Sequence, residues 1–328
     1  MIVTLTPNPS LDRTVEIDEL RRGEVHRATG GRVDPGGKGV NVSRALAAND
    51  IATVAVLPSG GPEGAQLAAL LAPFGVQTVQ VPISGTVRSN ITVAEPDGTT
   101  TKLNEAGPEL AADEAAAVAR TVVDLASRAS WVVGAGSLPR GLGVDFYARL
   151  VTALRDSHTQ VCIDASGPPL AAAVDAGPNL IKPNAEELAS VLGHSPEALE
   201  AAVAQGDPEP VVSAARQLVD RGVGAVLATL GAAGAVLVDE TGSWLATPPP
   251  ITARSTVGAG DASLAGYLRA DVGGAVPPQR LQMAVAYGSA AAALPGSALP
   301  TPGQIDLNAV RVTPIAPISP TTNTKVSP

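Results

Sequence analysis

Cysteine, histidine and aromatic residues are all scarce in this sequence. The chain has one cysteine, three histidines, two phenylalanines and two tryptophans in 328 residues. A lone cysteine excludes an internal disulfide, and the apolar run "VCIDA" around Cys162 indicates a buried strand rather than a reactive thiol. None of the histidines is spaced with cysteines or acids as zinc ligands usually are. We therefore expect neither thiol nor zinc chemistry, and a core filled by alanine, valine and leucine.

Long apolar runs and a surplus of basic residues are missing as well. No run approaches the length of a membrane span, and the start "MIVTLTPNPS" lacks the basic residues and long apolar stretch of a signal peptide. We therefore expect a cytoplasmic protein without a membrane partner. The net charge of −9 argues against a nucleic-acid-binding surface, which needs clustered Lys and Arg. A small anionic substrate in a local basic pocket is compatible with this charge.

What the sequence does contain is a regular alternation of two kinds of segment. With 45% hydrophobic and 16% charged residues, the chain is expected to be globular. Short β-type runs such as "TVAVL", "WVVG" and "AVLATL" alternate with alanine-rich helical stretches such as 112–128 and 208–221. This alternation predicts the α/β class, with a mostly parallel sheet covered by helices.

Two stretches, 13–34 and 87–107, break the alternation. The second contains "PDG" between runs rich in β-branched residues, which predicts a hairpin. We expect both stretches to form a small projecting sheet that serves as a lid beside a cleft. After Ile305, repeated Pro and Thr predict an extended or mobile tail. The predicted organisation is thus one domain over residues 1–305, including the lid segments, and a tail over 306–328.

The run "RSTVGAGDAS" (254–263) places Asp261 after two glycines where a helix is expected to begin. One interpretation is a helix cap, because aspartate accepts hydrogen bonds from the first free amides of a helix. The other is an anion site. The nearly bare turn Gly258–Ala259–Gly260 would let its N–H groups approach an anion at the helix N-terminus. In that case Asp261 lies beside a phosphate.

A second glycine-rich turn, in "VDPGGKGVNVSRALA" (33–47), precedes another helical pattern. Its spacing fits neither the Walker-type phosphate loop nor the dinucleotide fingerprint. It is either a tight turn or a ligand site, in which the backbone at Gly37, the charge of Lys38 and the amide of Asn41 contact a polar ligand. Upstream, Asp12 in "TPNPSLDRT" is either a solvated loop residue or an acceptor for sugar hydroxyls.

Further polar residues occur in the lid segments and at predicted strand ends. Arg27 and Arg88 are either solvated side chains or a phosphate clamp. Ser137, in the turn "GSLPRG", is a candidate sugar contact. In "IKPNAEEL", Asn184 and Glu187 form either a capping box or an oxygen-rich Mg²⁺ position. The last two candidates are Thr229 and Gly231. They follow a predicted strand at the edge where open α/β sheets bind ligands, although a tight turn explains them equally well.

Seven motifs, taken together and in order, resemble those of the ribokinase-like carbohydrate kinases, in their phosphofructokinase B branch. They are "PSLDRT", "PGGKGVNVSRAL", "VRSN", "GSLPRG", "IKPNAEEL", "TLG" and "TVGAGD". The resemblance runs from Met1 to about residue 300. It implies a three-layer α/β/α domain with a β-sheet lid, ATP and Mg²⁺ as cofactors, and a homodimer formed through the lid sheets. "TPNPSLD" with "GGKG" is most similar to bacterial members that phosphorylate the C6 hydroxyl of fructose 1-phosphate.

Two other substrates in the branch stay open, tagatose 6-phosphate and fructose 6-phosphate. A protein of another class, a non-catalytic sugar-phosphate-binding regulator, is a remote alternative, because such a binder does not require a base at Asp261. The sequence departs from the family in two places. Ala262 stands where the family usually has Ser or Thr, and the Pro/Thr-rich tail has no family counterpart.

The resemblance also implies a role for each candidate residue. Asp261 corresponds to the general base that takes the proton of the attacking sugar hydroxyl, and the amides of Gly258, Ala259 and Gly260 form an anion hole for the transferring phosphoryl group. The residues implied to hold the sugar phosphate are Asp12, Arg27, Gly37, Lys38, Asn41, Arg88 and Ser137. Those implied to bind the nucleotide are Asn184, Glu187, Thr229 and Gly231, with Glu187 also holding Mg²⁺ through water.

Overall fold

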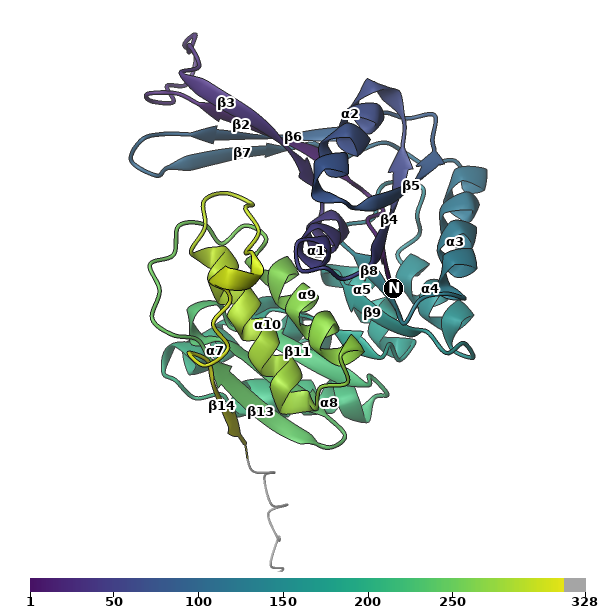
Figure 1. Cartoon of the computed structure of the whole chain (residues 1–328), viewed down its shortest axis with the longest axis vertical. Helices are drawn as coiled ribbons and strands as arrows, with labels where there is room; N and C mark the ends of the chain where they lie inside the picture. The colour runs from purple at the N-terminus through teal and green to yellow at the C-terminus, as the bar shows by residue number, and fades with distance from the viewer. Residues whose placement is uncertain (316–328) are drawn as a thin grey trace, which may run out of the picture.

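A large twisted sheet forms the centre of the molecule (Figure 1). The structure is a computed structural model that describes residues 1–315. From β5 to β11 all neighbouring strands run parallel, and β12 to β14 complete one edge in antiparallel orientation. In spatial order the strands are β14 (Arg311–Pro314), β13 (Gly242–Thr247), β12 (Ala235–Asp239), β11 (Ala225–Thr229), β10 (Leu180–Ile181), β9 (Gln160–Asp164), β8 (Trp131–Ala135), β1 (Ile2–Leu5), β4 (Thr53–Ser59) and β5 (Gln77–Pro82).

Helices cover both faces of this sheet. The first face carries α1 (Lys38–Ala47), α2 (Gly61–Leu71), α9 (Ala259–Val272) and α10 (Pro277–Ala292). The second face carries α3 (Ala112–Ala126), α4 (Phe146–Leu154), α5 (Gly167–Asp175), α6 (Ala185–Leu192), α7 (Pro196–Ala204) and α8 (Glu209–Asp220). Short 3₁₀ turns are η1 (Ala72–Phe74), η2 (Gly231–Ala233) and η3 (Pro302–Gln304). The expected α/β architecture is thus confirmed.

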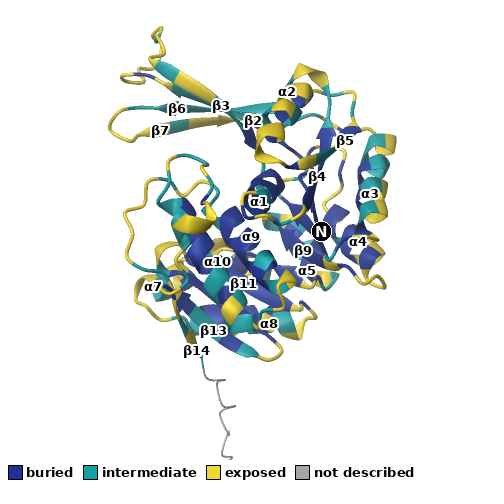
Figure 2. Cartoon of the chain, viewed as in Figure 1, coloured by how far each residue is buried: buried dark blue, intermediate teal, exposed yellow. Residues whose placement is uncertain are grey.

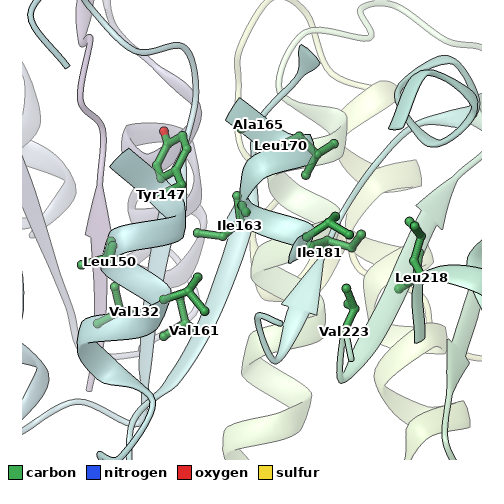
Figure 3. Close-up of a cluster of buried hydrophobic side chains, with 14 of the residues drawn as sticks. Val132, Tyr147, Leu150, Val161, Ile163, Ala165, Leu170, Ile181, Leu218 and Val223 are labelled. Atoms are coloured by element: carbon green, nitrogen blue, oxygen red, sulfur yellow. The ribbon is translucent and has the colours of Figure 1, made fainter. Parts of the chain in front are cut away.

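The core lies in two layers because successive side chains of a strand point to opposite faces of the sheet. In β9, Val161 and Ile163 join the cluster on the second face, and Cys162 joins the cluster under α9 and α10. Both faces of the central parallel strands β1, β8 and β9 are buried, which is why these strands read as nearly continuous apolar runs. Figure 3 shows the second face, where aliphatic side chains surround the buried Tyr147.

A second sheet, here called the lid sheet, projects from one end of the molecule (Figure 1). It contains, in spatial order, β3 (Gly30–Gly36), β2 (Ser10–Glu16), β6 (Arg88–Ala94) and β7 (Thr100–Asn104). The central pair β2 and β6 runs parallel, and the outer pairs run antiparallel. The turn 95–99 joins β6 to β7, so the predicted "PDG" hairpin is present. Figure 2 shows that these strands are far more exposed than those of the large sheet.

The end of the described chain differs from the expected tail. Residues 311–314 form β14, which pairs with β13 at the edge of the large sheet. Edge pairing needs only backbone N–H and C=O groups and alternating side chains, which "RVTP" supplies despite its proline. The first part of the expected tail is therefore joined to the main domain, and residues 316–328 lie outside the described residues. Within residues 1–315, no helix has the length and apolar character needed to cross a membrane.

Candidate active site

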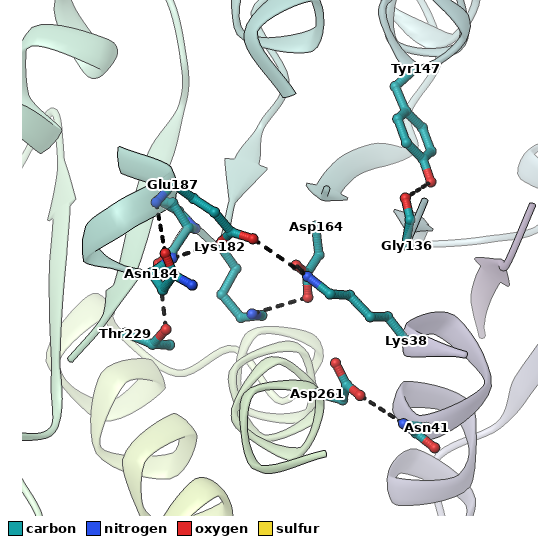
Figure 4. A network of polar contacts seen from close by, with 11 residues as sticks. Lys38, Asn41, Gly136, Tyr147, Asp164, Lys182, Asn184, Glu187, Thr229 and Asp261 are labelled. Atoms are coloured by element: carbon teal, nitrogen blue, oxygen red, sulfur yellow. Dashed lines mark hydrogen bonds and ion pairs between the residues drawn. The ribbon is translucent and has the colours of Figure 1, made fainter. Parts of the chain in front are cut away.

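Six of the candidate residues gather at the carboxyl ends of the parallel strands, where β9, β10 and β11 meet the first turns of α1 and α9 (Figure 4): Lys38, Asn41, Asn184, Glu187, Thr229 and Asp261. Asp164 is the last residue of β9, Lys182 directly follows β10, and Thr229 ends β11. Open α/β sheets bind ligands at this edge, because the loops there are free of the sheet's hydrogen-bond ladder. The fold therefore brings together segments that are far apart in the sequence.

Asp261 lies in the first turn of α9 but does not cap it. Gly258, in the left-handed region at φ 77°, is the N-cap residue. The Asp261 carboxylate instead accepts a hydrogen bond of 2.8 Å from Asn41 Nδ2 on α1. A side chain at Gly260 would approach the Lys182 ammonium, since a Cβ built there lies 3.3 Å from Nζ. A residue with a side chain at position 260 would therefore crowd the lysine.

Burial sets the protonation behaviour of Asp261. The residue is only 7% exposed. Burial, together with the nearby Asp164 carboxylate, raises the pKa of Asp261 to about 6, although Lys182, Asn41 and Lys38 act in the opposite direction. A carboxylate with this pKa is ionised at neutral pH and still basic enough to accept a proton.

Asp164 is the centre of a buried ion cluster. Its side chain is fully buried and pairs with Lys38 Nζ at 2.8 Å and Lys182 Nζ at 3.0 Å. Burial alone would raise the pKa of Asp164, but the two lysines lower it overall. Burial alone would likewise lower the pKa of Lys38, and the Asp164 pair raises it. Asp164 thus holds both ammonium groups at one place, and the Glu187 and Asp261 carboxylates lie close enough to act on Lys38 as well.

Sequence reasoning assigned no role to Asp164 or Lys182. Asp164 was passed over as the end of the buried run "VCIDA", and its partner Lys38 is 126 residues away. A usable signal existed, because an acidic residue that closes an otherwise apolar strand needs a cation when it is buried. Lys182 follows a strand in the same way, in "LIKPN".

Asn184 and Glu187 form the predicted capping box at the start of α6. Asn184 Oδ1 accepts from the Glu187 amide at 2.7 Å, and Glu187 Oε2 accepts from the Asn184 amide at 2.9 Å. The second carboxylate oxygen, Oε1, lies 3.9 Å from Lys38 Nζ. The capping interpretation is therefore correct, and the same geometry also turns Glu187 toward the Asp164 cluster (Figure 4).

A cavity of about 610 Å³ opens next to this cluster, between α9, α10 and the turn after β11. Thr229 and Gly231 lie on its wall, as does Asn184. Much of the remaining wall is apolar or glycine backbone and includes Pro249, Ile251, Ala259, Val285 and Gly288. A flat aromatic base with a polar tail suits such a surface.

The sugar-side candidates lie at the root of the lid sheet. Asp12 Oδ1 accepts hydrogen bonds from Ser10 Oγ at 2.7 Å and Asn90 Nδ2 at 2.9 Å. Its carboxylate lies directly over Gly36, where an added Cβ would come within 2.4 Å of it. Gly37 has a φ of 117°, and a Cβ there would collide with Thr6. The two glycines therefore permit β2, β3 and α1 to converge.

Arg88 lies at the start of β6 and is engaged with the backbone. Its Nη2 donates to Asn8 O at 3.1 Å and its Nη1 donates to Glu105 O at 2.9 Å. Burial lowers its pKa, and the Asp12 and Glu105 carboxylates oppose that shift. The guanidinium therefore ties the lid sheet to the loop after β1 and retains N–H donors for a further acceptor.

Ser137 and Arg27 differ in their surroundings. Ser137 follows β8 and accepts a hydrogen bond of 3.3 Å from Asn8 Nδ2, which places it near the Arg88 anchor. Arg27 is exposed in the connection between β2 and β3, and no contact joins it to the other candidates within the described part of the chain. Lys38 faces Asp164 and Glu187 and lies in the same ion cluster as Lys182. The roles inferred for these residues stay predictions.

The sequence is similar to those of known sugar-phosphate kinases. A 1-phosphofructokinase from Rhodobacter capsulatus is 35% identical over 95% of this chain and 96% of its own length. An ATP-dependent 6-phosphofructokinase isozyme 2 from Mycobacterium tuberculosis is 37% identical over 80% of this chain and 76% of its own.

Solved structures agree in fold. Phosphofructokinase-2 from Escherichia coli in complex with potassium has a TM-score of 0.86 at 31% identity and covers 93% of this chain and 96% of its own. Ribokinase from Arabidopsis thaliana, at 21% identity, has a TM-score of 0.73 over 93% of this chain and 96% of its own, so the architecture is ribokinase-like. Residues 6–303 match the pfkB family of carbohydrate kinases, and the chain belongs to this family.

Proposed function

We propose that this kinase transfers the γ-phosphoryl group of ATP to the C6 hydroxyl of fructose 1-phosphate, giving fructose 1,6-bisphosphate and ADP. The observation that carries the proposal is the buried Asp261 at the bare N-terminus of α9, held by Asn41 and faced by two lysines. The Rhodobacter capsulatus relative, named for this activity, aligns with nearly the whole chain.

The nucleotide binds in the cavity beside α10. The apolar wall near Ile251 and Val285 accepts the base, and Thr229 and Gly231 contact the rest of the nucleoside. The phosphates then extend toward the first turn of α9, whose free amides and dipole favour negative charge. This direction brings the γ-phosphate to the Asp164 cluster, where Lys38 and Lys182 neutralise it.

An acidic residue at this cluster fits Mg²⁺, which prefers oxygen ligands and keeps part of its water shell. Glu187 has one carboxylate oxygen directed at the cluster, whereas both oxygens of Asp164 pair with lysines, so Glu187 is the acidic residue that fits the ion. Glu187 holds the ion through water, and Asn184 fixes the Glu187 side chain through the capping box. When bound, the ion supplies charge neutralisation for the ATP phosphates.

Proton transfer is the work of Asp261. Its ionised carboxylate accepts the proton of the sugar C6 hydroxyl while that oxygen forms its bond to the γ-phosphorus. The bond between the γ-phosphorus and the bridging oxygen breaks, and ADP leaves with the electron pair. The amides of Gly258, Ala259 and Gly260 stabilise the charge on the transferring group. Ala262 is fully buried and packs against Tyr287, so it leaves the carboxylate of its neighbour in place.

The sugar phosphate binds between α1 and the root of the lid sheet. Asp12 accepts hydrogen bonds from sugar hydroxyls, with Asn90 and Ser10 holding it in place. Arg88 meets the substrate's phosphate, and Arg27 reaches it from the β2–β3 connection. The remaining sugar contacts are Gly37, Asn41 and Ser137, and Lys38 lies between the sugar and the γ-phosphate, where its ammonium group contacts both. This orientation presents C6 to Asp261 and the phosphate on C1 to the lid.

The lid sheet also supplies a surface for a homodimer. Arg13 pairs in register with Val33 on β3 and Ile91 on β6, and Ile91 pairs with Leu103 on β7. These side chains share the face opposite Asp12 and Asn90, and Leu103 is 58% exposed. A second copy would cover Ile91 and Leu103 on this face and the exposed sheet edges. Light scattering at micromolar concentration tests this, and a fully active monomer would reject it.

A coupled ADP-release assay tests the substrate. Fructose 1-phosphate, fructose 6-phosphate, tagatose 6-phosphate and unphosphorylated fructose are compared at matched concentrations of Mg²⁺ and ATP. We expect the highest kcat/KM with fructose 1-phosphate. The Mycobacterium tuberculosis relative named 6-phosphofructokinase makes fructose 6-phosphate the main competitor, and a preference for it would overturn the substrate assignment.

A further inference from the structure

Arg44 is a buried arginine whose position is not explained by packing alone. It lies on α1 and is 4% exposed. Its guanidinium carbon is 4.4 Å from the centre of the Phe74 ring, and its Nε has no hydrogen-bond partner within the described residues. Within residues 1–315 it forms no ion pair at 4.0 Å or less. A buried cation costs free energy unless it is compensated, so its few contacts are informative.

Within the described part of the chain, the one hydrogen bond that the Arg44 guanidinium donates goes to the active site. Arg44 Nη1 donates to Asn41 Oδ1 at 3.3 Å, one helical turn away. Asn41 Nδ2 then donates to Asp261 Oδ2 at 2.8 Å. All three side chains are at least nine-tenths buried. The result is a chain of two hydrogen bonds that leads from beneath the lid sheet to the base at the start of α9.

The donors and acceptors of Arg44 and Asn41 fix the direction of these two hydrogen bonds. An asparagine amide can turn by 180° with almost no change in shape, so its oxygen and nitrogen can exchange places. Arginine has donors only, and it therefore holds the Asn41 oxygen on its own side. The NH₂ group is thereby left facing Asp261. A turned amide would present its oxygen to the carboxylate, which favours the protonated acid over the ionised base.

We propose that Arg44 is a positioning residue for phosphoryl transfer, which holds the Asn41 amide with its NH₂ group against the Asp261 carboxylate. The inference rests on the proposed function, because it concerns the base of that reaction. Arg44 does not touch the reacting atoms. It acts by keeping Oδ2 of Asp261 occupied and ionised, so that the other oxygen is free for the sugar hydroxyl.

Several other charged groups surround the two ends of this chain. Asp34 on β3 and Asp12 on β2 face Arg44. Asp164, Lys182 and Lys38 face Asp261 from β9, from the end of β10 and from α1. Removing Arg44 leaves the groups around Asp261 in place. A change in the titration of the base would therefore report on the Asn41 amide, provided that long-range charge effects are measured separately.

The experiment compares the acidic limb of the pH profile of kcat/KM in the wild type, Arg44→Met, Asn41→Ala and the double variant. We expect Arg44→Met to raise the midpoint of this limb by roughly 0.5–1 pH unit, the size expected when a carboxylate loses one hydrogen bond. Its kcat at pH 7 should fall roughly 3- to 30-fold. In the Asn41→Ala background, Arg44→Met should not move the midpoint further.

Arg216→Met is the matched control. Arg216 is a partly buried arginine on α8 that donates to backbone carbonyls of the β12–β13 hairpin, away from the site. Its loss should lower the melting temperature and leave the acidic limb unchanged. If Arg44→Met does not fold, Arg44→Gln serves the same test, because a glutamine amide can itself turn and no longer fixes Asn41. The same upward shift is then expected.

Two results would overturn the inference. The first is an acidic limb that Arg44→Met leaves unchanged in an enzyme whose melting temperature has fallen, which would make Arg44 a packing residue. The second is an equal shift with and without Asn41, which would make its charge act directly. A wild type that does not use fructose 1-phosphate refutes the proposed substrate instead, and the four variants are then compared on the sugar phosphate that it accepts.

Discussion

The phosphoryl-transfer end of the site and the lid sheet are built in different ways. At the transfer end, Asp164 and Asp261 are almost completely buried and are held by contacts of 2.8–3.0 Å from strand ends and helix starts. In the lid sheet, most side chains are partly or fully exposed (Figure 2), and only the root of the sheet packs against α2, through residues such as Val33. Arg88 ties this sheet to the body through backbone carbonyls.

This difference indicates where each part of the reaction is prepared. Side chains locked by burial and by several partners keep their geometry before the substrate arrives, which is what charge stabilisation in the transition state requires. A thin sheet attached at its root is less constrained, and in the proposed reaction it gains contacts when a sugar phosphate or a second subunit binds. The comparison predicts that transfer-end variants lower kcat and that lid variants change substrate preference.

The largest effect is expected for Asp261→Asn. The substitution keeps the shape of the side chain and removes the base, so turnover should fall roughly 10²- to 10⁴-fold. Binding of ATP and of the sugar phosphate, measured by calorimetry, should change little. If more than a tenth of the wild-type turnover survives, Asp261 is not the base, and the rigid transfer end has another purpose.

Arg88→Ala should have the next largest effect, and it acts on the lid. A partly buried phosphate that loses its cation costs about 2–5 kcal/mol, which corresponds to roughly 30- to 4,000-fold in kcat/KM for fructose 1-phosphate. The KM for ATP should stay nearly constant. Steady-state kinetics on fructose 1-phosphate and on free fructose measure the preference directly.

The hydrogen bonds of Arg88 to Asn8 O and Glu105 O make that preference the decisive quantity. If Arg88 only anchors the lid sheet, Arg88→Ala lowers kcat/KM for both sugars by the same factor and leaves the preference intact. Arg88→Lys sharpens the distinction, because lysine restores the charge but cannot span two carbonyl groups. A phosphate contact predicts partial recovery with fructose 1-phosphate alone.

The two regions also differ in how far the sequence predicts them. The parallel sheet and the lid hairpin follow from local patterns, since strand periodicity and "PDG" are read over a few residues. Asp261 and the other candidates were found because their motifs are short and ordered. The Asp164 cluster was missed because its lysines come from α1 and from the end of β10, and only the folded chain brings them together.

Long-range contacts account for the remaining differences. The strand β14 was not predicted, because the partner that makes "RVTP" a strand is β13, more than sixty residues earlier. The orientation of Lys38 toward Asp164 and Glu187 could not be predicted from "GGKG", because the turn sequence does not indicate which distant residues its lysine contacts. The burial of Arg44 is not predicted by "NVSRAL", because an arginine on a helix is usually solvated.

The pH profile tests the electrostatics of the transfer end. Asp261 must be ionised to accept a proton, and burial raises its pKa to about 6. Activity is therefore expected to be nearly full at pH 7.5 and to fall as the pH drops through 6, reaching about a tenth of the plateau at pH 5. An acidic limb with a midpoint near 4 would mean that water reaches the carboxylate and that the site is less closed than described here.

The smallest effect is expected for Glu187→Gln, which separates the metal role of this residue from its role in the capping box. Glutamine at this position can still accept from the Asn184 amide, so the cap is kept while the negative charge near Lys38 is lost. The Mg²⁺ concentration that gives half-maximal rate should rise roughly 3- to 30-fold, with a melting temperature close to that of the wild type. Glu114→Gln is the matched control, because Glu114 occupies the same third position of α3, outside the site, and its side chain accepts from the Ala111 backbone amide at 2.8 Å. That variant loses one charge at a helix start and should leave the Mg²⁺ requirement unchanged.

An unaltered requirement in Glu187→Gln would leave Glu187 as a cap alone, and the order of the transfer end would then depend on Asp164 and its lysines.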